Sequence, residues 1–157
     1  MTIDATDNVD KIRAIVKALE NDFSGIKIYI AGISKSTRNT ISLAKAMDGE
    51  VAGFIHASAL ADEVHGFDTR KLVSRNVFIH HKGDACMGTP LSDVRSSSQR
   101  FGTRLIVLEG GDDKDKSACG PFTLHAYYQI ETRLYQVAPI STNLILSFVA
   151  EHVLGLP

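Results

Sequence analysis

The sequence has 157 residues, of which 44% are hydrophobic and 22% are charged, and its net charge is −1. These proportions are typical of an ordinary globular domain that is large enough to bury a core. The isoelectric point is near 6.6 and no run of basic residues occurs, which argues against proteins that bind nucleic acid or a membrane surface. We therefore expect a single domain over residues 1–157, with neither nucleic acid nor a membrane as partner.

The sequence also bears on the compartment. Its first eight residues contain neither a basic region nor an apolar core, and no stretch is long enough for a membrane span. The two cysteines, Cys86 and Cys119, have no partner cysteines at metal-like spacing. That pattern is typical of free thiols in a reducing environment. The sequence thus predicts a cytoplasmic protein.

Helix-like and strand-like segments alternate in the first part of the chain. Apolar residues recur at helical spacing from Val9 to Phe23, which predicts an amphipathic helix. The apolar run at 26–31 predicts a strand, and the next helix is expected to end near Gly49. A second strand is predicted at 51–55.

The rest of the chain continues this alternation. In order, we expect a short helix at 69–73, a strand at 77–79, a helix at 90–100, strands at 105–108 and 126–131, and a helix from Pro139 onward. Helices alternating with short apolar strands are typical of a parallel sheet with helices on both faces. In such sheets ligands bind beyond the carboxyl ends of the strands, where residues 32–37, 80–84 and 109–112 would lie.

The loop after the first predicted strand has the composition of an anion site. The first N–H groups of a helix lack internal partners, and the peptide dipoles add positive charge there. The hydroxyl and ammonium groups of this loop would add further donors. Its candidate ligand-binding residues are Gly32, Ser34, Lys35, Ser36 and Thr37. The alternative is that Ser34 or Ser36 only caps the helix.

A second group of polar residues follows the predicted strand at 77–79. His80, His81 and Lys82 are candidate ligand-binding residues that would attract a phosphate as point charges. Adjacent histidines on a strand point to opposite faces, so we predict no metal there, and we expect no cofactor. Glu131 is a further candidate ligand-binding residue, or else an edge-strand charge.

Several stretches resemble a known family. Ala31-Gly32-Ile33-Ser34-Lys35-Ser36 before a helix looks like the first strand, loop and helix of the SIS (sugar isomerase) phosphosugar-binding domain. Phe54-Ile55-His56-Ala57-Ser58-Ala59 and His65-Gly66 are similar to the second SIS domain of the glucosamine-fructose-6-phosphate synthase family. Ala138-Pro139-Ile140 resembles the start of the closing helix of that domain. The resemblance implies a flavodoxin-like αβα sandwich of three layers with a five-stranded parallel sheet.

The same resemblance implies a set of catalytic residues. Aldose–ketose isomerisation needs a base, a group that opens the sugar ring, and a cation or donor near the enediolate. The resemblance assigns ring opening to His65 and the remaining roles to Lys45 with Asp48 or Glu50. Asp48 keeps the family spacing from Lys45, whereas Glu50 lies nearer to His56. The alternatives are a solvated helix end, a turn histidine at His65, and a core or interface histidine at His56.

The resemblance leaves two functions. The expected one is a sugar-phosphate isomerase that acts as a homodimer, which Ser34-Lys35-Ser36, His65 and the nearby carboxylates favour. The alternative is a catalytically silent SIS module that serves as a regulatory or structural subunit paired with another SIS chain, which the absence of the family's Ser-x-Ser-Gly-x-Thr loop favours. A nucleotide-binding doubly wound domain is the competing fold, although Gly32-Ile33-Ser34 is not a G-x-G-x-x-G turn.

Overall fold

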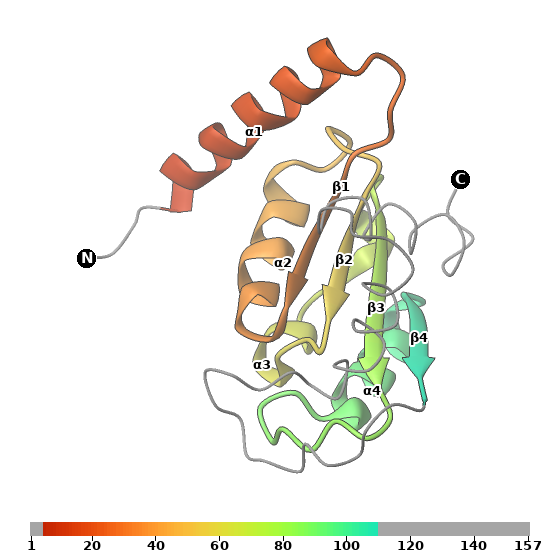
Figure 1. Ribbon diagram of the computed structural model, residues 1–157. Coiled ribbons are helices and arrows are strands. Elements are labelled where there is room, and N and C mark those ends of the chain that lie inside the picture. Colours follow the sequence, from red (N-terminus) through yellow and green to blue (C-terminus); the bar gives the residue numbers. More distant parts are fainter. Residues whose placement is uncertain (1–4, 110–157) are drawn as a thin grey trace.

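The computed structural model describes residues 5–109, which form a parallel four-stranded sheet in the order β1-β2-β3-β4 with helices between the strands (Figure 1). The elements are α1 (Ala5–Asp22), β1 (Tyr29–Ile33), η1 (Ser34–Ser36), α2 (Thr37–Ala46), β2 (Gly53–Ala57), α3 (Ala61–Val64), η2 (Thr69–Lys71), β3 (Arg75–His81), α4 (Leu91–Phe101) and β4 (Arg104–Leu108). The predicted α/β class with a parallel sheet is confirmed.

The strands extend further toward their carboxyl ends than the sequence predicts. Gly32, expected in a loop, pairs with His56 in the sheet. His80 and His81, also expected in a loop, are the last residues of β3 and pair with β4. The apolar run ends earlier than the strand because backbone hydrogen bonds form whatever the side chain is.

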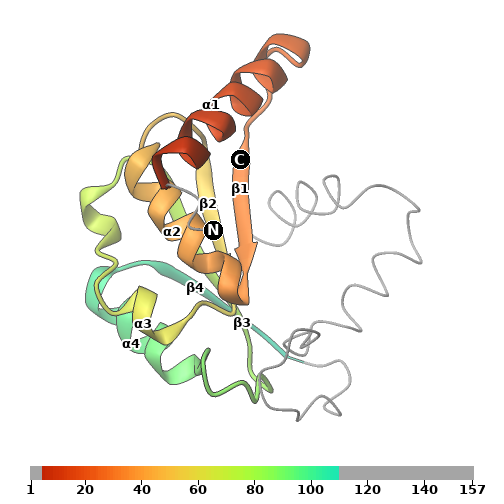
Figure 2. The same ribbon diagram turned by 90° about the vertical axis from the view of Figure 1, so that its left-hand side faces the viewer.

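The described helices all contribute to the core on one face of the sheet. Figure 2 shows α2, α3 and α4 on the same side of the strands. One buried cluster joins residues of all four α-helices to the strand residues Phe54 and Phe78. Its helix members include Val16, Ile41, Ala44, Val64 and Val94. The 3.6-residue spacing of apolar positions explains this shared face.

The opposite face of the sheet carries a second cluster, formed by Ile55, Ala57, Val77 and Ile79. These side chains are buried, yet no described helix belongs to their cluster. The predicted layer of helices on both faces is therefore not confirmed within residues 5–109. The strand expected at 126–131 and the helix expected from Pro139 lie outside the described residues. The five-strand count and the extent of a single domain stay predictions.

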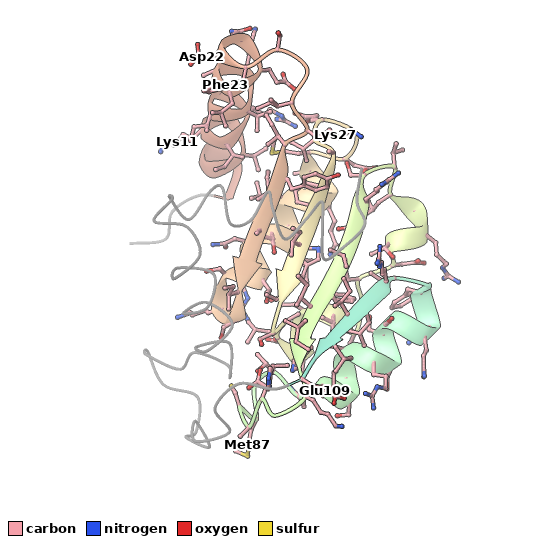
Figure 3. The ribbon with its side chains drawn as sticks, turned by 45° about the vertical axis from the view of Figure 1, so that its right-hand side comes forward. Lys11, Asp22, Phe23, Lys27, Met87 and Glu109 are labelled. Atoms are coloured by element: carbon pink, nitrogen blue, oxygen red, sulfur yellow. The ribbon has the colours of Figure 1, made fainter. Side chains whose placement is uncertain are left out.

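Helix α1 forms where the sequence predicts it, but much of its apolar face is not buried. Val16 packs in the core, whereas Ile15 and Phe23 are 55% and 56% exposed. Figure 1 shows α1 slanting away from the sheet, and Figure 3 shows Phe23 near the end of α1. No helix in residues 5–109 has the length and apolarity needed to cross a membrane. The cytoplasmic location stays a prediction.

His56 is a core histidine, which was one of its two structural alternatives. Its Nδ1 lies 2.8 Å from Thr40 Oγ1, and its Nε2 lies 3.0 Å from Asn76 Oδ1. The ring also packs against Phe67 and Phe78. Burial lowers the pKa of His56 to about 4, because a charged imidazolium is poorly solvated there. His56 therefore links α2 to β3 as a neutral side chain.

Candidate functional site

Ser34 occupies a sharp turn between strand β1 and helix α2. It follows the last residue of β1 and opens η1, which runs directly into α2. Its φ is +54°, a left-handed conformation that is uncommon and strained for a residue with a Cβ atom. Strain of this kind is concentrated at functional sites.

Gly32 makes this turn sterically possible. A Cβ atom at Gly32 would lie 2.8 Å from the backbone oxygen of Ser36 and 2.7 Å from Thr40 Cγ2. The turn is also tied from within, because Thr37 Oγ1 donates a 2.6 Å hydrogen bond to the carbonyl of Ser34. The close approach of α2 to β1 therefore requires glycine two residues before Ser34.

Asp84 lies beyond the carboxyl end of β3 and is the most fully bonded carboxylate of this edge. Its side chain is only 1% exposed. The Oδ1 atom accepts a 3.0 Å hydrogen bond from the backbone N–H of Cys86. The Oδ2 atom accepts from Ser58 Oγ at 2.8 Å and from Thr89 Oγ1 at 3.2 Å, and it lies 3.4 Å from His80 Nε2. Such donors hold a buried carboxylate in one orientation.

The sheet register places these residues at a common edge. Ile33 at the end of β1 pairs with Ala57 at the end of β2, and Ala57 pairs with Ile79 in β3. Ser34 and Ser58 therefore follow directly after paired residues of adjacent strands. In Figure 3 the labelled Glu109 and Met87 mark this carboxyl edge, and Lys27 lies toward the opposite, amino edge. The carboxyl edge thus combines a hydroxyl on a strained turn with a buried carboxylate.

The other predicted ligand residues do not form a phosphate cradle. The hydroxyl of Thr37 is engaged by Ser34 and by the backbone N–H of Leu60. His81 Nδ1 accepts a hydrogen bond from Gly83 N, and Lys82 forms an ion pair with Glu109. Lys35 and Ser36 are exposed beside the turn, and His80 is buried against Asp84. Glu131 lies outside the described residues.

The residues predicted to catalyse isomerisation have separate structural partners. Asp48 accepts hydrogen bonds from the backbone of Val73 and Ser74, which precede β3. Glu50 forms a bidentate pair with Arg13 of α1. The Lys45 ammonium lies 5.8 Å from the ring centre of Phe67, and His65 Nε2 lies 3.1 Å from Asp93 Oδ1. These contacts do not bring the four residues into one site.

Cys86 differs from its expected state. It is disulfide-bonded, and the described part of the chain contains no free cysteine. The prediction of a free thiol at Cys86 is therefore wrong. The other cysteine of the sequence, Cys119, lies outside the described residues. Among residues 5–109 no group of three or more His, Cys, Asp or Glu side chains is arranged to hold a metal ion.

The sequence predicted Ser34 as an anion ligand or a helix cap, and it did not indicate that Ser58 and Asp84 belong to one site. The available signal was Gly32-Ile33-Ser34-Lys35-Ser36 directly after an apolar run, which matches the G-x-S-x-G turn of a nucleophilic serine except that Ser36 stands in place of the second glycine. Ser58 gave no such signal, because its φ of +43° and its contact with Asp84 depend on the fold.

Among the comparisons with known proteins, the solved structures indicate the fold. No protein-family model and no curated protein matches this sequence. An alpha-beta serine hydrolase homologue from Coxiella burnetii matches with a TM-score of 0.56 and 15% identity, over 87% of this chain and 59% of that one. A serine hydrolase without a lid from Xanthomonas campestris matches with a TM-score of 0.55 and 14% identity, over 87% of this chain and 57% of that one. A predicted CIB-like hydrolase from Thermoplasma acidophilum matches with a TM-score of 0.54 and 18% identity, over 85% of this chain and 59% of that one.

These findings correct the resemblance to SIS domains. The solved structures that match are α/β hydrolase folds, so the SIS assignment, the isomerase activity, the sugar-phosphate partner and the pairing with an SIS chain are all wrong. SIS domains and α/β hydrolases both place loops and helices at the carboxyl edge of a parallel sheet. The short motifs in this sequence therefore did not distinguish one fold from the other. The chain spans less than two thirds of the length of the structures it matches. Residues 5–109 thus have an α/β-hydrolase-like fold.

Proposed function

We propose that this protein is a serine hydrolase in which Ser34 is the nucleophile for acyl transfer from an ester to water. The observation that carries the proposal is the turn at Ser34, where a left-handed φ of +54° and a crowded Gly32 place the serine between β1 and α2. A strained strand-to-helix turn of this type exposes the serine hydroxyl at the edge of the sheet. Solved structures with the same fold that are described as serine hydrolases support it.

The position of Ser34 also suits the charge that acyl transfer develops. Attack of Ser34 Oγ on the ester carbonyl forms a C–O bond and an oxyanion, while a base takes the hydroxyl proton. The backbone N–H of Lys35, the residue after the nucleophile, can donate a hydrogen bond to this oxyanion. Lys35 also lies just before the N-terminus of α2, where the helix dipole is positive. The leaving alcohol takes the proton, and water then releases the acid from Ser34.

Asp84 is the proposed acid of the triad. It is buried, it is held by three hydrogen-bond donors, and it follows Ser34 in the chain, which is the order of the triad in this fold. The base is then a histidine that follows Asp84. The sequence offers His125 and His152, both outside the described residues. His80 touches Asp84, but it is fully buried within β3 and precedes the acid.

Hydrolysis of p-nitrophenyl acetate by the purified protein tests this proposal. Ser34→Ala should lower kcat/KM by about 10³-fold or more, because the nucleophile is lost. The matched control is Ser36→Ala, two residues further on and exposed, which should retain activity. An inactive wild-type protein, or an active Ser34→Ala variant, contradicts the proposal.

Two further variants identify the base. His125→Ala and His152→Ala should differ, with one losing about 10³-fold and the other staying near wild type. His65→Ala is the control, since this exposed histidine pairs with Asp93 and precedes Asp84 in the chain. Retention of full activity by both His125→Ala and His152→Ala would rule out the proposed triad order.

A further inference from the structure

Ser58 has an unusual backbone for a buried residue with a side chain. It lies directly after the last residue of β2, and its N–H donates a 2.9 Å hydrogen bond to the carbonyl of Ile79. Its φ is +43° and its exposure is 0%. Glycine adopts a left-handed φ without steric cost, whereas serine does not. A serine at this point is therefore strained in a way that glycine would relieve.

The hydroxyl of Ser58 gives a reason for a side chain at this position. It donates a 2.8 Å hydrogen bond to Asp84 Oδ2. Thr89 and the backbone N–H of Cys86 hold the carboxylate from the loop that follows it. Ser58 acts from a different strand, so it fixes Asp84 relative to the sheet edge that carries Ser34.

His80 is a titratable group that faces Asp84, and its Nε2 lies 3.4 Å from Asp84 Oδ2. The ion pair of Lys82 with Glu109 is solvent-exposed on the same edge. Ser58 has no exposed surface, so it does not touch a substrate and acts through Asp84.

We infer that Ser58 is a positioning residue of the hydrolase, which holds the Asp84 carboxylate in the orientation that the catalytic base requires. The inference rests on the proposed function of Ser34 and Asp84. Loss of a hydrogen bond to a charged group typically changes an equilibrium by about ten- to a hundredfold. Removal of the Ser58 hydroxyl should thus lower kcat/KM by about tenfold or more.

The pair Ser58→Gly and Ser58→Ala separates this role from a structural one. Ser58→Gly removes the hydroxyl while it relieves the left-handed backbone, and this relief offsets part of the stability that is lost with the hydrogen bond. Both variants should lose about tenfold in kcat/KM for p-nitrophenyl acetate. The acid limb of the pH profile should also move to higher pH, because a carboxylate that loses a donor attracts the protonated base more strongly.

Ser97→Ala is the matched control, since the hydroxyl of Ser97 is also buried and donates a 2.8 Å hydrogen bond, to the carbonyl of Val64. It should leave the pH profile unchanged. An unshifted profile in Ser58→Gly, with wild-type kcat/KM, overturns the inference while Ser34→Ala still tests the proposed function. An inactive wild-type protein overturns both, and it is recognised before any Ser58 variant is compared.

Discussion

The two edges of the sheet each hold a carboxylate among hydrogen-bond donors, and their surroundings differ. At the carboxyl edge, Asp84 is buried and accepts from two side-chain hydroxyls, one of them on the strained Ser58. At the amino edge, Asp48 accepts hydrogen bonds mainly from the backbone N–H groups of Val73 and Ser74, with a further one from the Ser74 hydroxyl. The donors of Asp48 close the loop before β3, whereas Asp84 is bonded to a serine with a strained backbone, and such strain is concentrated at functional sites.

The neighbours of a carboxylate indicate its role better than its spacing in the sequence does. The spacing of Asp48 from Lys45 in the sequence suggested a catalytic role, but its hydrogen bonds to Val73 and Ser74 hold the loop before β3 in place. Asp84 has no spacing signal, and its neighbours decide its proposed role. Four substitutions test this contrast, in order of decreasing expected effect.

Asp84→Asn should reduce ester hydrolysis by about 10³-fold, because an amide does not stabilise a protonated base and presents an N–H group to the donors around it. Steady-state kinetics with p-nitrophenyl acetate measures the loss. Asp48→Asn is the matched control at the other edge and should retain wild-type kcat/KM. Equal activities of the two variants would remove the distinction between the edges.

Gly32→Ala should destabilise the fold by about 2–3 kcal/mol, because its Cβ would press on the backbone of Ser36. Urea denaturation followed by circular dichroism measures the change in the free energy of unfolding. Gly66→Ala provides the control, as no atom lies within 4 Å of a Cβ there. If the two alanine variants prove equally stable, the turn at Ser34 is not crowded.

His56, which lies in β2 between the two edges, should make the free energy of unfolding depend on pH. Its folded pKa of about 4 lies below the usual 6.5, so the unfolded chain binds the proton more tightly. The contribution of His56 to the free energy of unfolding is complete above pH 6.5, and it falls by up to about 3 kcal/mol as the pH drops toward 4. His56→Gln should flatten this part of the stability curve, while His65→Gln should not. An unchanged slope in His56→Gln would show that His56 is not buried as a neutral group.

Asp48→Asn should have the smallest effect, about 1 kcal/mol of stability at neutral pH. The N–H groups of Ser74 and Val73 lower the pKa of Asp48, so the benefit of its charge is present above the usual carboxyl pKa. It is lost as the pH falls through the lower folded value. The midpoints of thermal unfolding of the wild-type protein and of Asp48→Asn should become equal at low pH. A constant difference between them down to low pH would contradict the role of the charge.

The sequence predicted the elements better than the site. Alternating apolar runs located α1, α2, β3, α4 and β4 because local hydrophobic periodicity reflects burial. The ends of β1 at Ile33 and of β3 at His81 were misplaced, since the backbone hydrogen bonds that extend a strand leave no mark on the pattern of side chains. The contact between Ser58 and Asp84 joins residues 26 positions apart, and the left-handed φ of Ser34 is a conformational fact. Neither can be obtained from residue spacing.

Reaction of the purified protein with a fluorophosphonate, followed by peptide mass spectrometry, tests the central claim most directly. The phosphorus atom forms a bond to an activated serine oxygen and releases fluoride. The account predicts a single adduct on the peptide that contains Ser34, and none in Ser34→Ala. An adduct on another residue, or no adduct on a folded wild-type protein, would contradict the assignment of Ser34 as the nucleophile.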